Sequence, residues 1–89
     1  MQSKTLTIIN KLGLHARAAA RFVQLASSFD CEVNISVGGK KVSGKSIMGI
    51  MMLAASKGTS IEIITAGSDE EQAMNALENL ILDKFGEGE

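Results

Sequence analysis

The chain has 89 residues, 45% hydrophobic and 21% charged, which is the balance of one small globular domain. Nine Lys and Arg against ten Asp and Glu leave a net charge of -1, and the three aromatic residues are all Phe. This composition argues against nucleic-acid binding, which needs a basic face or aromatic rings that stack on bases. With one Cys and one His, we expect neither a disulfide framework nor a metal site, and no cofactor.

The apolar segments are short. The longest one, from Ile47 to Ala55, contains Gly49 and is about half of the roughly 20 residues that a membrane-spanning helix needs. The first four residues lack the charged and apolar regions of a signal peptide. We therefore expect a cytoplasmic protein without membrane insertion, folded as a single domain over residues 1–89.

Hydrophobic periodicity predicts seven elements in chain order. Polar and apolar residues alternate, as in strands, over residues 4–9, 31–37, 40–43 and 60–65. Apolar residues recur at helical spacing over residues 16–28, 47–54 and 68–86. Gly38 and Gly39 between two strands indicate a tight hairpin. The predicted order is β-α-β-β-α-β-α, an α+β class, and one sheet with its helices on one face is the simplest two-layer arrangement.

The three predicted helix starts differ from one another. The last helix begins with Ser68-Asp69-Glu70-Glu71, which is typical of a capping box. The middle helix begins at Ser46, a favourable N-cap residue. The first helix begins at His15-Ala16-Arg17, where histidine is a poor cap and a cation in the first turn opposes the helix dipole. The first start therefore breaks the rules that favour stability.

A bound anion would explain the unfavourable start of the first helix. The free amides of Ala16, Arg17 and Ala18 and the helix dipole favour a negative ligand, and the Arg17 guanidinium can donate two parallel hydrogen bonds to phosphate. His15 adds a nucleophile that can form a covalent intermediate. The alternative is structural, because a histidine before a helix is often a solvated loop residue and an arginine often extends into water. The sequence pattern leaves both interpretations open.

The middle helix has almost no polar face: Ile47, Met48, Ile50, Met51, Met52 and Leu53. One short helix on an open sheet cannot bury every side, so part of this surface is expected to face a partner. We expect Ile50 and Leu53 in the core, whereas Met48 and Met51 fit a docking surface and core packing equally well. Capping alone explains Ser46, although a helix N-terminus also tolerates a phosphorylated serine.

Two motifs make the sequence similar to a known family. Residues 10–17, Asn-Lys-Leu-Gly-Leu-His-Ala-Arg, resemble the active-site signature of HPr, the histidine-containing phosphocarrier of the bacterial phosphotransferase system. Residues 44–51, Gly-Lys-Ser-Ile-Met-Gly-Ile-Met, resemble the second signature of that family, around its regulatory serine. Their separation, the element order and the length also agree. The resemblance implies an open-faced β-sandwich with a four-stranded antiparallel sheet and three helices on one face.

The resemblance also implies a role. His15 would accept a phosphoryl group on Nδ1 from phosphorylated Enzyme I, with help from Arg17, and pass it to Enzyme IIA domains. Ser46 matches the site of HPr kinase/phosphorylase, and transcriptional regulators are implied as further partners in organisms that have this kinase. The first two helices would form the docking face, with contributions from Ala20, Arg21, Ile47, Met48 and Met51. Such a carrier is modified itself and does not turn over alone, so whether it counts as an enzyme stays open.

One position departs from the family signature. Proline usually follows the arginine, whereas this chain has Ala18 and contains no proline. Besides the phosphocarrier, two hypotheses remain open: a regulatory homologue that acts by binding proteins, and a small-ligand domain that holds an anion without a covalent bond. A hydrolase is disfavoured because no convincing base or metal site accompanies His15. A carrier that exposes one face to successive partners is expected to be a monomer.

Overall fold

A computed structural model describes residues 1–88 of the chain. Its elements are β1 (Gln2–Thr7), α1 (Ala16–Ala26), β2 (Glu32–Val37), β3 (Lys40–Ser43), α2 (Ile47–Met52), β4 (Ser60–Ala66), α3 (Glu70–Leu82) and the 3-10 helix η1 (Lys84–Gly86). The predicted order is confirmed. The largest boundary error concerns the last helix, because α3 ends at Leu82 and a separate turn follows. Within the described residues, no helix combines the length and the apolarity needed to cross a membrane.

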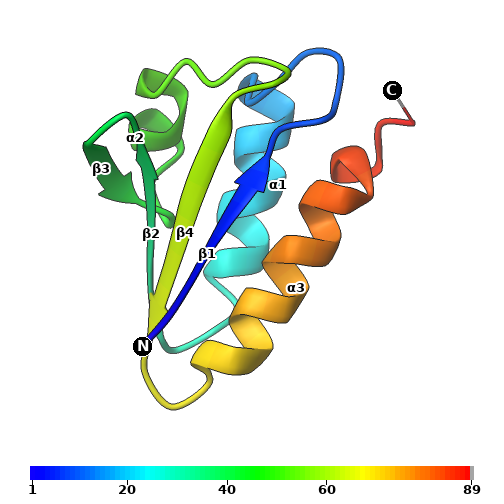
Figure 1. Cartoon of the computed structure of the whole chain (residues 1–89). Coiled ribbons are helices and arrows are strands. Elements are labelled where there is room, and N and C mark those ends of the chain that lie inside the picture. The colour runs from blue at the N-terminus through cyan, green and yellow to red at the C-terminus, as the bar shows by residue number, and fades with distance from the viewer. Residues whose placement is uncertain (89) are drawn as a thin grey trace.

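The four strands form one antiparallel sheet in the order β1-β4-β2-β3. Apolar residues face one another in the register, where Leu6 pairs with Ile61 and Ile35 pairs with Ile63. The predicted hairpin joins β2 to β3 through Gly38 and Gly39, whose φ angles are 55° and 86°. Positive φ at both positions suits a turn that follows the twist of the strands. This sheet matches the expected four-stranded antiparallel arrangement (Figure 1).

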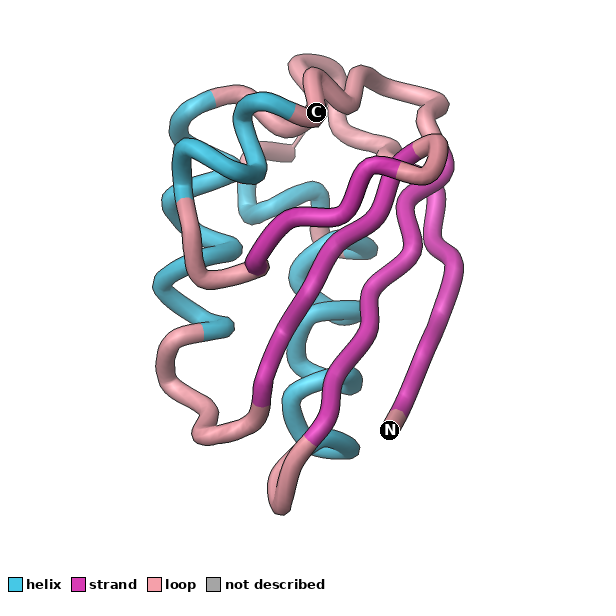
Figure 2. The backbone as a smooth tube through the Cα atoms, turned by 90° about the vertical axis from the view of Figure 1, so that its left-hand side faces the viewer, coloured by secondary structure: helices cyan, strands magenta, loops and turns pink. Residues whose placement is uncertain are grey.

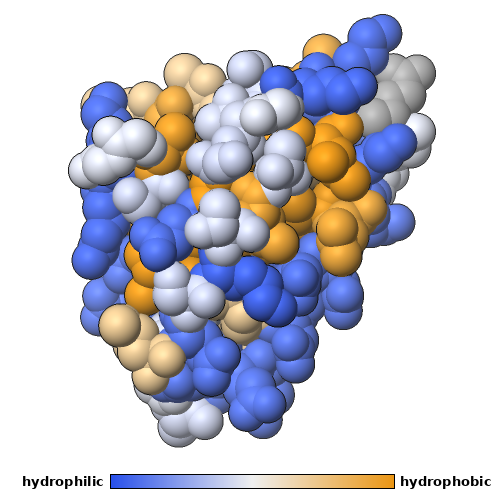
Figure 3. All heavy atoms as spheres, viewed as in Figure 1, coloured by the Kyte–Doolittle hydropathy of each residue, from blue (hydrophilic) through white to orange (hydrophobic). Residues whose placement is uncertain are grey.

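The helices cover one face of the sheet, as Figures 1 and 2 show from two directions. The core lies between these layers, and its largest fully buried apolar side chains are Phe22, Phe85, Ile8, Ile35, Ile50, Ile61, Ile63, Leu77 and Ile81. Along β4 buried residues alternate with more exposed ones, which explains why the sequence pattern predicts a strand here. In Figure 3, hydrophilic and weakly polar side chains cover much of the outer face of the sheet, and hydrophobic ones gather toward the C-terminal end of α3.

The helix starts confirm two of the three expectations. The Ser46 Oγ accepts a hydrogen bond from the Gly49 amide at 3.0 Å, so Ser46 caps α2 as predicted. His15 is the N-cap residue of α1 and makes no side-chain capping bond, as its residue type indicates. The predicted capping box is wrong, because the N-cap of α3 is Asp69 and its side chain makes no capping bond either.

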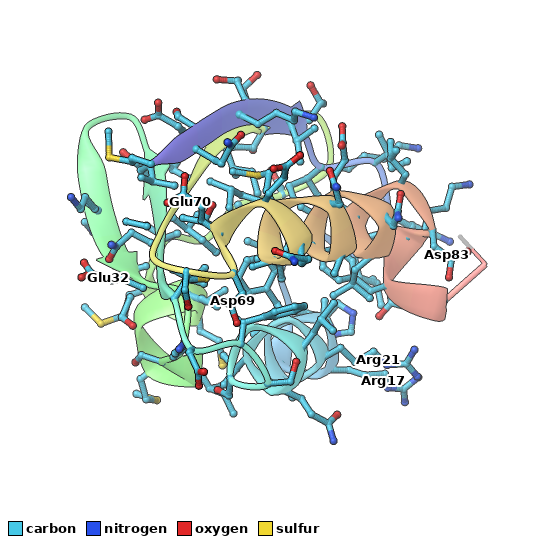
Figure 4. The ribbon with its side chains drawn as sticks, turned by 90° about the horizontal axis from the view of Figure 1, so that it is seen from below. Arg17, Arg21, Glu32, Asp69, Glu70 and Asp83 are labelled. Atoms are coloured by element: carbon cyan, nitrogen blue, oxygen red, sulfur yellow. The ribbon has the colours of Figure 1, made fainter. Side chains whose placement is uncertain are left out.

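Asp69 has a different structural role. Its carboxylate accepts the backbone amides of Asp30 and Cys31, each at 2.8 Å, and so ties the start of α3 to the segment before β2. Figure 4 labels Asp69 at this start of α3. Glu70 takes part in the local turn by accepting the Gly67 amide at 3.1 Å. The start of α3 is therefore held by a hydrogen-bonded contact with the segment before β2, in place of the predicted capping box.

Candidate functional site

The loop before α1 fixes the position of His15. Gly13 has φ 66°, and a Cβ at this position would lie 2.5 Å from the Ala55 carbonyl oxygen. The same carbonyl accepts the Leu14 amide at 2.8 Å. The buried side chain of Asn10 donates from Nδ2 to the Gly13 carbonyl at 2.8 Å. Glycine is therefore required two residues before His15, and the loop is held from both sides.

His15 stands at the N-terminus of α1 in an extended conformation, with φ -75° and ψ 179°. Its carbonyl accepts the Ala19 amide at 2.8 Å. The amides of Ala16, Arg17 and Ala18 come before this hydrogen bond, in the part of a helix where amides have no intrahelical partner. Ala16 and Arg17 are exposed, whereas the Ala18 side chain is fully buried. The three residues predicted to bind phosphate thus lie together at the positive end of the helix dipole.

The C-terminal turn reaches this site, a contact that no local sequence pattern predicts. Lys84, Phe85 and Gly86 have positive φ angles of 55°, 56° and 76° and form the 3-10 turn that follows α3. The Phe85 side chain is fully buried, and the Phe85 backbone carbonyl accepts a hydrogen bond from the Arg21 Nη1 at 2.5 Å. The turn thereby brings the next residue, Glu87, to the N-terminus of α1.

Glu87 contacts the predicted nucleophile directly. One carboxylate oxygen pairs with the His15 Nε2, and the other accepts the Asn10 Nδ2 at 3.0 Å. The glycine-rich sequence of residues 86–89 predicts a frayed end. This prediction is wrong for Gly86 and Glu87, which make the contacts described here, while Glu89 lies outside the described residues. A phenylalanine beyond the end of α3, followed by glycine, was the signal that this segment packs back onto the domain.

The charges around the site favour an anion. Eight residues line a surface pocket of about 550 Å³: Lys11, Leu12, His15, Ala16, Arg17, Arg21, Gly86 and Glu87. Three of them are cationic and one is acidic, beside the N-terminus of α1. Figure 4 shows the Arg17 and Arg21 side chains extending from α1 in the same direction. A phosphoryl group at this place would meet guanidinium donors together with helix amides.

Glu87 is ionised in this setting. Burial raises the pKa of its carboxyl, whose side chain is only 11% exposed. Hydrogen bonds from Asn10 and His15, together with the charges of His15 and Arg17, lower the pKa by more, so the net shift is downward. At neutral pH the group that faces the His15 Nε2 is therefore a carboxylate, which can only accept hydrogen bonds.

Comparison with known proteins identifies the family. A family model described as "PTS HPr component phosphorylation site" matches residues 2–83. The chain belongs to the HPr family. It is 57% identical over its full length to the phosphocarrier protein HPr of Neisseria meningitidis serogroup A, which it covers completely. It is 54% identical to the phosphocarrier protein HPr of Cupriavidus necator, again with complete coverage of both chains. The chain is a phosphocarrier of the phosphotransferase system.

Solved HPr structures share its fold. The crystal structure of HPr-C-His from Thermoanaerobacter tengcongensis superposes with a TM-score of 0.95, at 50% identity and 98% coverage of both chains. HPr from Bacillus anthracis gives a TM-score of 0.87 at 46% identity, with 90% of this chain and 95% of that chain covered. A structure described as an HPr dimer from Thermoanaerobacter tengcongensis gives 0.79 at 50% identity, covering 98% of this chain and 100% of that one.

The HPr fold also presents an apolar surface beside the site. Met48 is 70% exposed, and Ile47 and Met51 are each 41% exposed. Ile50 and Leu53 are buried, as predicted, and Met48 and Met51, whose placement the sequence left open, are exposed. Leu12 and Met52 are each 66% exposed as well, and neither was predicted as a docking residue. The predicted docking residues Ala20 and Arg21 are exposed on α1, which packs against α2.

Proposed function

We propose that His15 is the phosphorylated residue of this HPr-family phosphocarrier and that Arg17 holds the phosphoryl group. The observation that carries the proposal is the placement of an imidazole at the uncapped N-terminus of α1, in one pocket with Arg17. Phosphorylated Enzyme I is the proposed donor and an Enzyme IIA domain the proposed acceptor. We further propose that the chain acts as one domain, as a monomer and in the cytoplasm.

The proposed transfer needs no cofactor. The lone pair of the His15 Nδ1 forms a bond to phosphorus while the bond between phosphorus and the donor breaks, and the donor keeps the electron pair. Arg17 donates to the phosphoryl oxygens, and the amides of Ala16 and Ala18 add two further donors. The reverse displacement delivers the group to the acceptor. Alanine at position 18 supplies an amide where the family signature has proline, which has none.

Transfer from the loaded carrier tests these roles. The chain is phosphorylated with Enzyme I and radiolabelled phosphoenolpyruvate, purified, and mixed with an Enzyme IIA domain. We expect the label to move to Enzyme IIA. Arg17→Ala should slow loading by about ten- to hundredfold, the range for losing hydrogen bonds to a charged group. Lys41→Ala, which removes an exposed cation from β3, is the matched control and should load normally. Equal rates for the two variants would refute the role of Arg17.

We propose that Ser46 is a regulatory phosphorylation site for a kinase of the HPr kinase/phosphorylase type and that transcriptional regulators read this modification. Ser46 begins the helix that carries the exposed Met48 and Met51. A phosphate there adds about -1.5 to -2 charges beside an apolar docking surface. Ser46→Asp should therefore weaken Enzyme I binding in calorimetry, whereas Ser46→Ala should leave it unchanged. Equal affinities would contradict the proposal.

A further inference from the structure

The Nε2 atom of His15, the proposed phosphoacceptor, faces a carboxylate that is itself held by a side-chain amide. The Glu87 carboxylate accepts from the His15 Nε2 with one oxygen and from the Asn10 Nδ2 with the other. The Glu87 side chain is 11% exposed, the His15 side chain is 27% exposed and Asn10 is fully buried. Two separate donors therefore fix this carboxylate in a partly desolvated place.

We propose that Glu87 is a positioning residue for phosphoryl transfer, whose carboxylate keeps the imidazole proton of His15 on Nε2 and leaves Nδ1 as the free nucleophile. This inference rests on the proposed function of His15. A neutral imidazole carries one N–H, and a carboxylate can only accept, so the bond to Glu87 requires the proton on Nε2. The lone pair then resides on Nδ1.

The hydrogen bond between Glu87 and the His15 Nε2 also lowers the energy barrier of the transfer step. As the Nδ1 lone pair bonds to phosphorus and the donor leaves with its own electron pair, the imidazole ring becomes positively charged. The proton stays on Nε2, where it faces the negative charge of Glu87. A fixed carboxylate on the second nitrogen of a catalytic histidine both selects the tautomer and stabilises the cationic ring. No proton, electron or further reactant is exchanged with solvent.

The C-terminal turn is built to present Glu87. Lys84 and Phe85 hold positive φ angles that side-chain-bearing residues rarely adopt, and burial of Phe85 together with the Arg21 bond to its carbonyl offsets this strain. A Cβ on Gly86 would lie 2.4 Å from the Arg21 Nη1, so glycine is needed for the bond to persist as it stands. Residues 72 positions apart in the sequence are thereby joined at one site.

Glu87 does not compete with the phosphoryl group for the same nitrogen. It contacts Nε2, whereas the family signature implies that Nδ1 is phosphorylated. A carboxylate that blocked the site would slow loading, and its removal would speed loading. A positioning carboxylate has the opposite effect, so the sign of the change in rate distinguishes the two interpretations.

The test compares Glu87→Ala, Glu87→Gln and the control Asp83→Asn, which removes a carboxylate from an exposed residue near the same end of the chain. Nitrogen-15 NMR of the histidine ring, at a pH where the ring is neutral, reports which nitrogen carries the proton. The initial rate of phosphorylation by Enzyme I is measured on the same samples, and circular dichroism checks that each variant is folded.

Glu87→Ala should raise the population of the Nδ1-protonated tautomer and slow loading by about tenfold or more, the factor for one hydrogen bond to a charged group. Glu87→Gln keeps an acceptor without the charge and should give an intermediate rate with the wild-type tautomer. Asp83→Asn should match the wild type in both measurements. A wild-type tautomer and rate in Glu87→Ala, or faster loading, would overturn the inference while His15 stays the phosphoacceptor. Absence of loading in the wild type itself would instead refute the proposed function.

Discussion

Replacing Ala18 with proline tests the geometry of the first turn of α1. His15 is the N-cap residue, so Ala18 is the third helical position, and the Ala19 amide is the one that bonds to the His15 carbonyl. Proline at position 18 therefore removes an amide that takes no part in the helix ladder. Its Cδ replaces the amide hydrogen, which points toward the N-terminal end of the helix.

Two opposing effects determine how Ala18→Pro changes the free energy of unfolding. A proline that fits the native backbone stabilises by about 0.4–1 kcal/mol because it restricts the unfolded chain. The Ala18 side chain is fully buried, and a ring that did not fit would cost about 1–3 kcal/mol through overpacking. We expect the first effect to win because the ring adds its volume on the amide side, beside the exposed Ala16 and Arg17. For a domain of this size the gain corresponds to an increase in Tm of about 2–8 °C.

Thermal unfolding followed by circular dichroism measures this change, with urea unfolding as a second determination of the free energy. Ala18→Pro should have a higher Tm than the wild type and should still be phosphorylated, because Arg17 and the Ala16 amide remain. A fall in Tm of about 4 °C or more would mean a loss of at least about 0.5–1 kcal/mol. That result would refute the geometry assigned to the first turn.

Three further perturbations test the fold around the site. Ser46→Ala should lower the free energy of unfolding in urea by about 1 kcal/mol because α2 loses its cap, and an unchanged midpoint would contradict this. Gly13→Ala should lower the Tm, since its Cβ would meet the Ala55 carbonyl at a positive φ, and a Tm equal to that of the wild type would count against the loop geometry. Hydrogen bonds from the backbone amides of residues 30 and 31 lower the pKa of Asp69 from its usual 3.8. The Asp69 carboxylate therefore stabilises the fold above that pH and ceases to do so as the pH falls through the lowered pKa. Asp69→Asn should flatten this part of the pH dependence in unfolding experiments above and below pH 3.8, and identical profiles would exclude the effect.

Local sequence signals were sufficient for most of the fold. The alternation of apolar and polar residues along β2 and the first part of β4 marks one buried and one exposed face, so Val33, Ile35 and Ile63 could be assigned to the core. Ser46 was recognisable as a cap because its partner amide is three residues away. His15 stood out for the opposite reason, since it occupies a cap position without capping chemistry. In each case the information lies within a few residues of the position concerned.

The errors have a common cause, which is contact between distant segments. Asp69 took the place expected for the Ser68 cap because its carboxylate bonds to the segment before β2, 38 and 39 residues away. Glu87 lies against His15 because Phe85 enters the core and Arg21 holds the turn, and no local pattern reports the partner of a carboxylate 72 residues from a histidine. Tertiary packing decided both positions.

The most direct test of the account is the mass of the intact chain after incubation with Enzyme I and phosphoenolpyruvate, with His15→Ala treated in parallel. We predict that the wild type gains one phosphoryl group, that acid removes it, as it does from a phosphorylated histidine, and that the variant gains none. No modification of the wild type by an Enzyme I that phosphorylates another carrier, or equal modification of the His15→Ala variant, would contradict the assignment of His15 as the phosphoacceptor.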